Sequence, residues 1–99
     1  MELSDVDLEV LAFIERLGHS LIKLDLIRFF AHNPYFMDTS SGIALRVGRG
    51  KEAVALELYD LFLLGVLERE RLDDTYVYYL SPDRGLRELL ARVISKVKF

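Results

Sequence analysis

Residues 38–72 constrain the fold of this chain more than any other stretch, because two helical patterns meet there at a turn only three residues long. A cluster of capping residues opens a short helix that is expected to end near Val47. A glycine-rich turn at 48–50 follows, and a longer helix runs over about 51–64. Gly65 ends this helix, and a charged strand pattern begins soon after it. A short helix, a glycine turn, a longer helix and a strand are therefore expected in that order.

The size and composition of the chain predict one domain that covers residues 1–99. Apolar residues make up 52% and charged residues 29% of the sequence, which are proportions of a globular rather than a disordered protein. No apolar run is long enough to span a membrane, and the acidic N-terminus does not have the pattern of a signal peptide. The chain has no cysteine, which excludes disulfides and thiolate metal sites. We therefore expect a cytoplasmic protein.

The net charge of −3 is a mild argument against a nucleic-acid-binding protein, because such proteins usually carry a basic surplus. The charge is also unevenly distributed, with a net −4 in residues 1–18 and a net +3 in residues 83–99. An acidic first helix and a basic last helix could pack against each other, within one chain or between two chains. Because both also carry much apolar surface, we expect a homodimer built on one or both of these helices.

Helices are expected on both sides of the 38–72 segment. The first, over about 4–17, has one apolar face and one charged face. The second, over about 21–32, is apolar around most of its circumference, so we expect it to be the central helix of the core. A last helix is expected over about 83–97, with Pro82 close to its start.

Strand patterns add a small sheet. Residues 67–71 and 75–80 read as two strands joined by a turn at 73–74, which predicts a β-hairpin. The residues of its second strand that are expected to face inward are Tyr76, Tyr78 and Leu80. Residues 35–37 are expected to form a short additional strand.

This order of elements resembles the winged helix-turn-helix superfamily, in particular bacterial and archaeal transcription regulators of the MarR, ArsR and PadR kinds. The matching residues lie in the supporting helix and its turn, on the inner side of the second helix of the motif, and in the hairpin. They are Ile43, Ala44, Gly48, Val54, Leu58, Leu61, Gly65, Val66, Leu67 and the strand 78–80. The resemblance, which covers about residues 20–80, implies an α+β, mostly helical fold. Its helix-turn-helix would lie at about 39–64 and its hairpin wing at about 66–80, with an extra N-terminal helix and a C-terminal helix.

The resemblance also implies a DNA-binding transcriptional regulator, with the second helix of the motif lying against DNA. Base edges and phosphates favour basic, amide and hydroxyl side chains on such a helix. Helical spacing instead turns Leu56, Tyr59 and Leu63 outward. The candidate DNA contacts are cations at the turn and in the wing, namely Arg46, Arg49, Lys51, Arg69 and Arg71. Binding would then depend mainly on phosphates and show weak sequence specificity.

Acidic residues near these cations oppose a DNA interface. Glu52, Glu57 and Asp60 are expected to face or flank phosphates unfavourably. The acids that are interleaved with the arginines of the wing are Glu68, Glu70, Asp73 and Asp74. A solvated surface of mixed charge is therefore the alternative interpretation of the same residues.

Apolar residues around the same helix indicate a second function. They could leave a contiguous exposed patch that consists of Leu45, Leu56, Tyr59, Phe62 and Leu63. If the terminal helices do not cover this patch, it is a protein-binding face whose contacts are Leu45, Leu56, Tyr59 and Leu63. A winged-helix protein-interaction module is therefore the alternative to a DNA-binding regulator.

The sequence indicates neither an enzyme nor a cofactor. Residues 48–51 are similar to the end of a phosphate-binding loop, but Glu52 replaces the required Ser or Thr and no strand precedes the turn. His19 and His32 have no partner ligands in register for a metal. No serine is paired with a base. We therefore expect no catalytic residue, no cofactor and no metal site.

Overall fold

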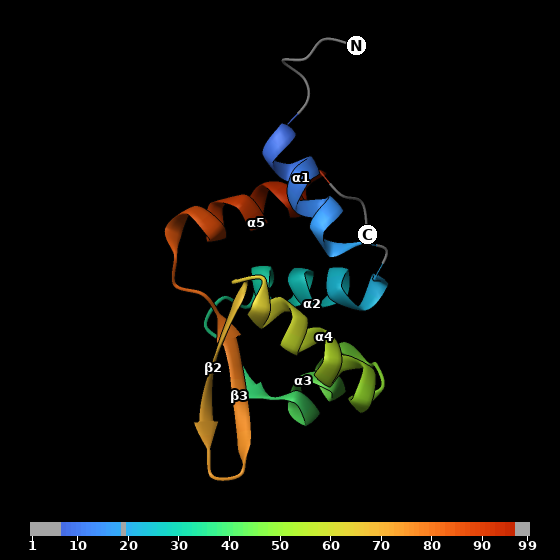
Figure 1. Ribbon diagram of the computed structural model, residues 1–99, viewed down its shortest axis with the longest axis vertical. Helices are drawn as coiled ribbons and strands as arrows, with labels where there is room; N and C mark the ends of the chain where they lie inside the picture. The colour runs from blue at the N-terminus through green and yellow to red at the C-terminus, as the bar shows by residue number, and fades with distance from the viewer. Residues whose placement is uncertain (1–6, 19, 97–99) are drawn as a thin grey trace.

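The computed structural model describes residues 7–18 and 20–96, and within them five helices and three strands (Figure 1). In chain order these are α1 (Leu8–Leu17), α2 (Leu21–His32), β1 (Met37–Thr39), α3 (Ser40–Val47), α4 (Lys51–Leu63), β2 (Leu67–Leu72), β3 (Thr75–Leu80) and α5 (Arg84–Lys96). The strands form one antiparallel sheet in the order β1-β3-β2. The predicted α+β, mostly helical fold with a β-hairpin wing is confirmed.

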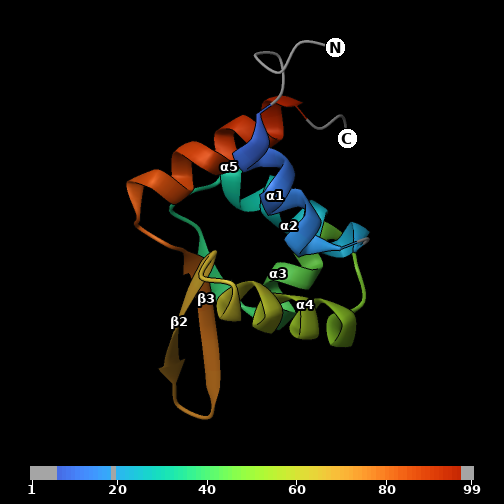
Figure 2. The ribbon, with the colours of Figure 1, turned by 45° about the horizontal axis from the view of Figure 1, so that its top comes forward.

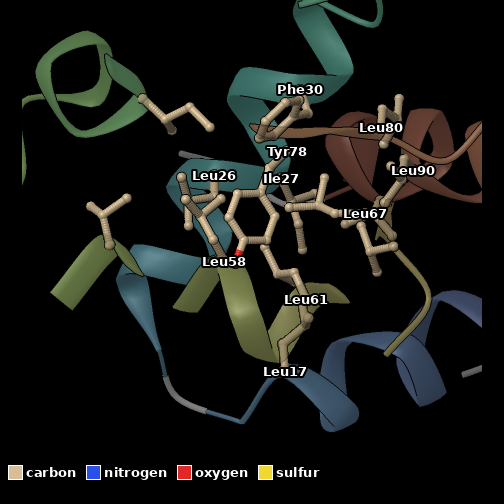
Figure 3. Packing of buried hydrophobic residues seen from close by; sticks show 14 of the residues in the cluster. Leu17, Leu26, Ile27, Phe30, Leu58, Leu61, Leu67, Tyr78, Leu80 and Leu90 are labelled. Atoms are coloured by element: carbon tan, nitrogen blue, oxygen red, sulfur yellow. The ribbon is translucent and has the colours of Figure 1, made fainter. Parts of the chain in front are cut away.

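The core lies around α2, which has helices on two sides. Helices α1 and α5 lie over one side, and α3 and α4 lie under the other (Figures 1 and 2). Leu26 and Phe30 of α2 are buried, and Figure 3 shows them converging with Leu58 and Leu61 of α4 and with Tyr78 of β3. The central position that the apolar sequence of this helix predicted is therefore confirmed.

The turn between α3 and α4 follows from local hydrogen bonds and one left-handed glycine. The Thr39 hydroxyl accepts a hydrogen bond from the Gly42 N–H at 3.3 Å and so caps the start of α3. Gly48 ends α3 with a φ of 69°, a conformation that glycine adopts without steric cost, and its N–H donates to the Ala44 carbonyl at 2.9 Å. Helix α4 can therefore start at Lys51, as the sequence predicted.

Two strands differ in detail from the prediction. The short strand β1 starts at Met37 rather than at residue 35, because the Phe36 N–H closes a turn on the Asn33 carbonyl at 3.1 Å. In β3, Tyr78 is buried as predicted, whereas Tyr76 is 37% exposed. The hairpin extends beyond the core near its turn, so the alternation of side chains no longer corresponds to an inside and an outside (Figure 1).

The terminal helices pack against each other within the chain. Helix α1 starts at Leu8, with Asp7 as its N-cap, and residues 4–6 of the predicted helix lie outside the described residues, as does residue 97 of the last helix. Arg92 of α5 lies 3.2 Å from the Asp7 carboxylate and 3.1 Å from that of Glu9. The predicted attraction between an acidic first helix and a basic last helix thus operates within one chain.

A small ion cluster joins α2 to α4. Lys23 Nζ lies 3.3 Å from Glu57 Oε2 and 3.1 Å from Asp60 Oδ2. The Ser20 hydroxyl caps α2 by accepting from the Lys23 N–H, and it donates to Glu57 Oε2 at 2.7 Å. Burial lowers the pKa of Lys23, but hydrogen bonds to Asp60 and Glu57 outweigh it, so the net shift is upward. The cluster therefore adds a polar contact between α2 and α4 to the packing of their buried side chains.

We expect Leu58→Ala to lower the free energy of unfolding by about 2–5 kcal/mol, because Leu58 is 0% exposed and its removal leaves a cavity. Leu56→Ala is the matched control, since Leu56 is on the same helix but 69% exposed, and it should change stability by less than about 0.5 kcal/mol. Denaturant titrations of the two variants measure the difference. Equal effects would show that the helical phase of α4 is wrong.

We expect Lys23→Met to lower the free energy of unfolding by about 1–3 kcal/mol, because half-buried Glu57 loses its cation. The folded state raises the pKa of Lys23 above its ordinary value of 10.5. The contribution is therefore fully present below that value and disappears as the pH rises through the folded-state pKa. Chemical denaturation at neutral and strongly alkaline pH should show a difference between wild type and variant that shrinks in alkali.

The double variant Lys23→Met/Glu57→Gln is the control for this effect, because it removes the unpaired charge. It should recover part of the lost stability. A double variant as unstable as the single one would mean that the aliphatic stem of Lys23, rather than its charge, supports α4.

Candidate functional site

The outward face of α4 is mostly apolar, as the helical spacing predicted. Leu56 and Leu63 are 69% and 62% exposed, and Tyr59 lies exposed between them along the helix. Leu45 of α3, which is 85% exposed, and Lys51 both line a shallow hollow of about 650 Å³ at the turn between α3 and α4. The terminal helices could have covered these residues, but they lie on the opposite side of α2 (Figure 1).

The acids in the second half of α4 lie beside this face and are paired with a lysine of α2. Glu57 and Asp60 were expected to face or flank phosphates, but both contact Lys23 of α2. The core packing of α4 and the Ser20–Glu57 hydrogen bond turn them to the side of the helix that meets α2. Of the acids on α4, Glu52 is exposed near the N-terminal end of the outward face, and the side chain of Asp60 is 51% exposed beside Lys23.

The strand register separates the charges of β2 as well. Arg69 pairs with Tyr78 across the hairpin, so Arg69 and Arg71 lie on the face of the sheet that turns Tyr78 to the core. Glu68 and Glu70 lie on the opposite face, because side chains alternate along a strand. The cations and acids that alternate in the sequence are thus on different sides of the sheet.

On the opposite face of the sheet, one of the two glutamates accepts a hydrogen bond. The Tyr79 hydroxyl donates to Glu70 Oε1 at 3.0 Å. This bond to a carboxylate raises the pKa of Tyr79, because it stabilises the protonated phenol. Glu70 is therefore engaged on the side of the hairpin that faces away from α4.

Arg69 joins the hairpin to α4 through aromatic rings, which the sequence did not predict. Its guanidinium carbon lies 4.0 Å from the ring centroid of Tyr76, 4.5 Å from that of Phe62 and 5.2 Å from that of Tyr59. A hydrogen bond with Tyr78 is the main cause that raises the pKa of Arg69. Arg69 therefore contacts both the hairpin and the C-terminal half of α4.

The three cations at the turn between α3 and α4 differ in their surroundings. The Arg46 guanidinium lies 5.0 Å from the ring centroid of Phe36. Arg49 Nε donates to Asp25 Oδ2 of α2 at 2.8 Å, and Lys51 is exposed in the first turn of α4. Arg49 and Lys51 therefore lie together at the turn, with part of the charge of Arg49 already compensated by Asp25. Arg46 instead lies beside Arg28 and Phe29 of α2.

The fifth candidate cation lies in the hairpin. Arg71 is exposed, and its Nε donates to the Asp73 carbonyl at 3.0 Å in the hairpin turn. Asp73 adopts a φ of 56°, which a tight two-residue turn requires. Arg71 thus lies farther from the core than Arg69, on the same face of the sheet.

The described part of the chain offers no other obvious chemical site. Within residues 7–18 and 20–96, no three His, Asp or Glu side chains lie close enough to hold a metal ion. His32 Nδ1 lies 2.9 Å from the Arg28 carbonyl oxygen one turn earlier, and His19 lies outside the described residues. None of the described helices has both the length and the apolar character to cross a membrane.

Comparisons with known proteins agree with the fold. No family model matches the chain, and no curated protein matches it. A solved structure described as a possible transcriptional regulator from Methanosarcina mazei Go1 superposes with a TM-score of 0.64 and 15% sequence identity. The match covers 81% of this chain and 71% of that chain. At such low identity the likeness concerns the fold, and that fold is a winged-helix layout.

Proposed function

We propose that this protein is a winged-helix transcriptional regulator that binds duplex DNA mainly through phosphates. The observation that carries the proposal is the separation of charge around α4. Glu57 and Asp60 share the single cation Lys23 of α2, and Glu68 and Glu70 lie on the far face of the hairpin. Cations at the turn and in the hairpin remain beside the outward face of α4. This arrangement suits an anionic surface better than the net charge of the chain suggests.

The proposed contacts fall into two groups. Lys51 at the N-terminal end of α4 and Arg71 in the hairpin would bind phosphates on either side of the helix. Arg46 and Arg49 would add positive charge beside Lys51. Arg69 would contribute chiefly by holding the hairpin at a fixed angle to α4, because its guanidinium already contacts three rings.

A protein-interaction module is the second candidate, and one observation favours it. Leu45, Leu56 and Leu63 are exposed together with Tyr59, and single-domain proteins seldom leave so many large apolar residues on neighbouring helices. In that case the same face would bind the apolar surface of a partner protein. DNA binding is preferred because the flanking cations have no evident use in an apolar contact.

We also propose that two copies associate through the end of the molecule formed by α1 and α5. Leu8 and Leu11 of α1 and Leu21 of α2 remain exposed after the two terminal helices have packed on each other. A twofold dimer would cover these residues and would present the two copies of α4 to successive turns of DNA.

Wild-type protein should bind random-sequence duplex DNA with an affinity that falls steeply as the salt concentration rises. Lys51→Ala and Arg71→Ala should each lower the slope of log affinity against log salt by about 0.9 for each lost phosphate contact. Glu52→Gln should strengthen binding, because it removes a negative charge from the outward face. Arg16→Ala, on α1, is the matched control and should leave the slope unchanged. Absence of binding to any duplex at low salt would contradict the proposal.

Light scattering at low micromolar concentration should give a mass about twice the 11.4 kDa of one chain. The double variant Leu8→Glu/Leu11→Glu should give a single-chain mass, because it places charges in the proposed apolar contact. Leu72→Glu, at an exposed position in the hairpin, is the control and should leave the mass unchanged. A single-chain mass for wild type would mean that α1 and α5 cover each other sufficiently within one chain.

A further inference from the structure

The outward face of α4 offers few hydrogen bonds to a base edge. Leu56, Tyr59 and Leu63, together called the apolar stripe, occupy positions i, i+3 and i+7 and therefore form one continuous line along the helix. Polar base edges that pack against leucine side chains lose their hydrogen bonds to water and gain none in return. A helix with such a face can enter a DNA groove favourably only where the groove is itself apolar.

One base presents an apolar group in the major groove. Thymine carries a methyl group there beside its O4 acceptor, whereas the other bases offer only hydrogen-bond donors and acceptors. A leucine side chain against this methyl group buries apolar surface on both molecules. The apolar stripe therefore matches the major-groove edge of A·T-rich DNA better than that of G·C-rich DNA.

The charges that flank the stripe select DNA over an apolar protein surface. Lys51 lies at the N-terminal end of α4, and Arg71 lies in the hairpin that packs against the C-terminal half of the helix. Glu57 and Asp60 are paired with Lys23. Glu52, one turn before Leu56 and next to Lys51, is an exposed acid on the same line. The apolar line with Lys51 and Arg71 beside it complements a groove that has methyl groups on its floor and phosphates along its rims.

The length of the stripe indicates how much DNA it covers. Leu56 and Leu63 are seven residues apart, which corresponds to about 10 Å along an α-helix. Neighbouring base pairs are about 3.4 Å apart along the duplex, so a helix lying along the groove would span roughly three base-pair steps. A short A·T tract is therefore sufficient to occupy it.

We propose that α4 reads thymine methyl groups in the major groove through the apolar stripe, so that this protein prefers A·T-rich duplex DNA. The inference rests on the proposed function and adds sequence preference to it. Leu56 and Leu63 are the residues that determine this preference, while the cations supply the affinity that is independent of sequence.

The test compares two duplexes that differ only in these methyl groups. One contains an A·T tract within a fixed flanking sequence, and the other has deoxyuridine at every thymine of the tract. Fluorescence anisotropy at low salt should show that the affinity of wild-type protein falls roughly three- to fourfold for each contacted methyl group. In a G·C tract, 5-methylcytosine should raise the affinity relative to cytosine, because it restores a methyl group at the same edge.

Leu56→Ser separates the methyl contact from the phosphate contacts. It should abolish most of the difference between the thymine and deoxyuridine duplexes and leave the salt dependence unchanged. Met37→Ser is the control, because Met37 of β1 is 50% exposed and pairs with Tyr79 on the face of the sheet opposite to Tyr78, and it should retain the wild-type difference. Circular dichroism of both variants checks that each is folded.

The outcomes distinguish this inference from the function on which it rests. Equal affinity for the thymine and deoxyuridine duplexes, with normal salt dependence, would overturn methyl recognition and leave phosphate binding intact. A difference that persists in Leu56→Ser would assign methyl recognition to other residues and would also overturn the inference. Failure to bind any duplex would instead overturn the proposed function, and the apolar stripe would then be assigned to a protein partner.

Discussion

The rotation of α4 about its own axis is the constraint on which the rest of this structure depends. On one side of the helix, Leu58 and its buried neighbours pack against α2 and Tyr78. On an adjacent side, Lys23 holds Glu57 and Asp60. Apolar burial supplies most of the free energy of this contact, but it tolerates small rotations. The ion cluster is directional, and it adds to the orientation that the burial of Val54, Leu58 and Leu61 sets.

The position of charge, rather than its sum, then decides what this surface can bind. The net charge of −3 argues against a nucleic-acid partner when it is treated as a property of the whole chain. The structure turns Glu57 toward α2, pairs half-exposed Asp60 with Lys23, and places Glu68 and Glu70 on the far face of the hairpin. The position of each of these acids has a local cause, which is either an ion pair with Lys23 or the alternation of side chains along β2. Neither cause is visible in composition.

The sequence predicted the features that depend on residues close to one another in the chain. Helical periodicity placed Val54, Leu58 and Leu61 inside, and the capping residues and Gly48 marked the turn, all as observed. The contacts of Lys23 and Arg69 could not be predicted in the same way. Each depends on the angle at which two elements cross, and that angle follows from packing of the whole core. The exposure of the Tyr76 side chain could not be predicted either, because it depends on where the hairpin extends beyond the core.

Exposed acids elsewhere on the surface affect the direction from which DNA would approach the proposed binding face. Exposed acids on α1 and on the far face of the hairpin repel a polyanion. A duplex that approaches from those sides therefore meets an unfavourable potential, whereas the turn before α4 and the inner face of the hairpin present cations. The negative net charge would then restrict the orientation in which DNA approaches rather than prevent its approach.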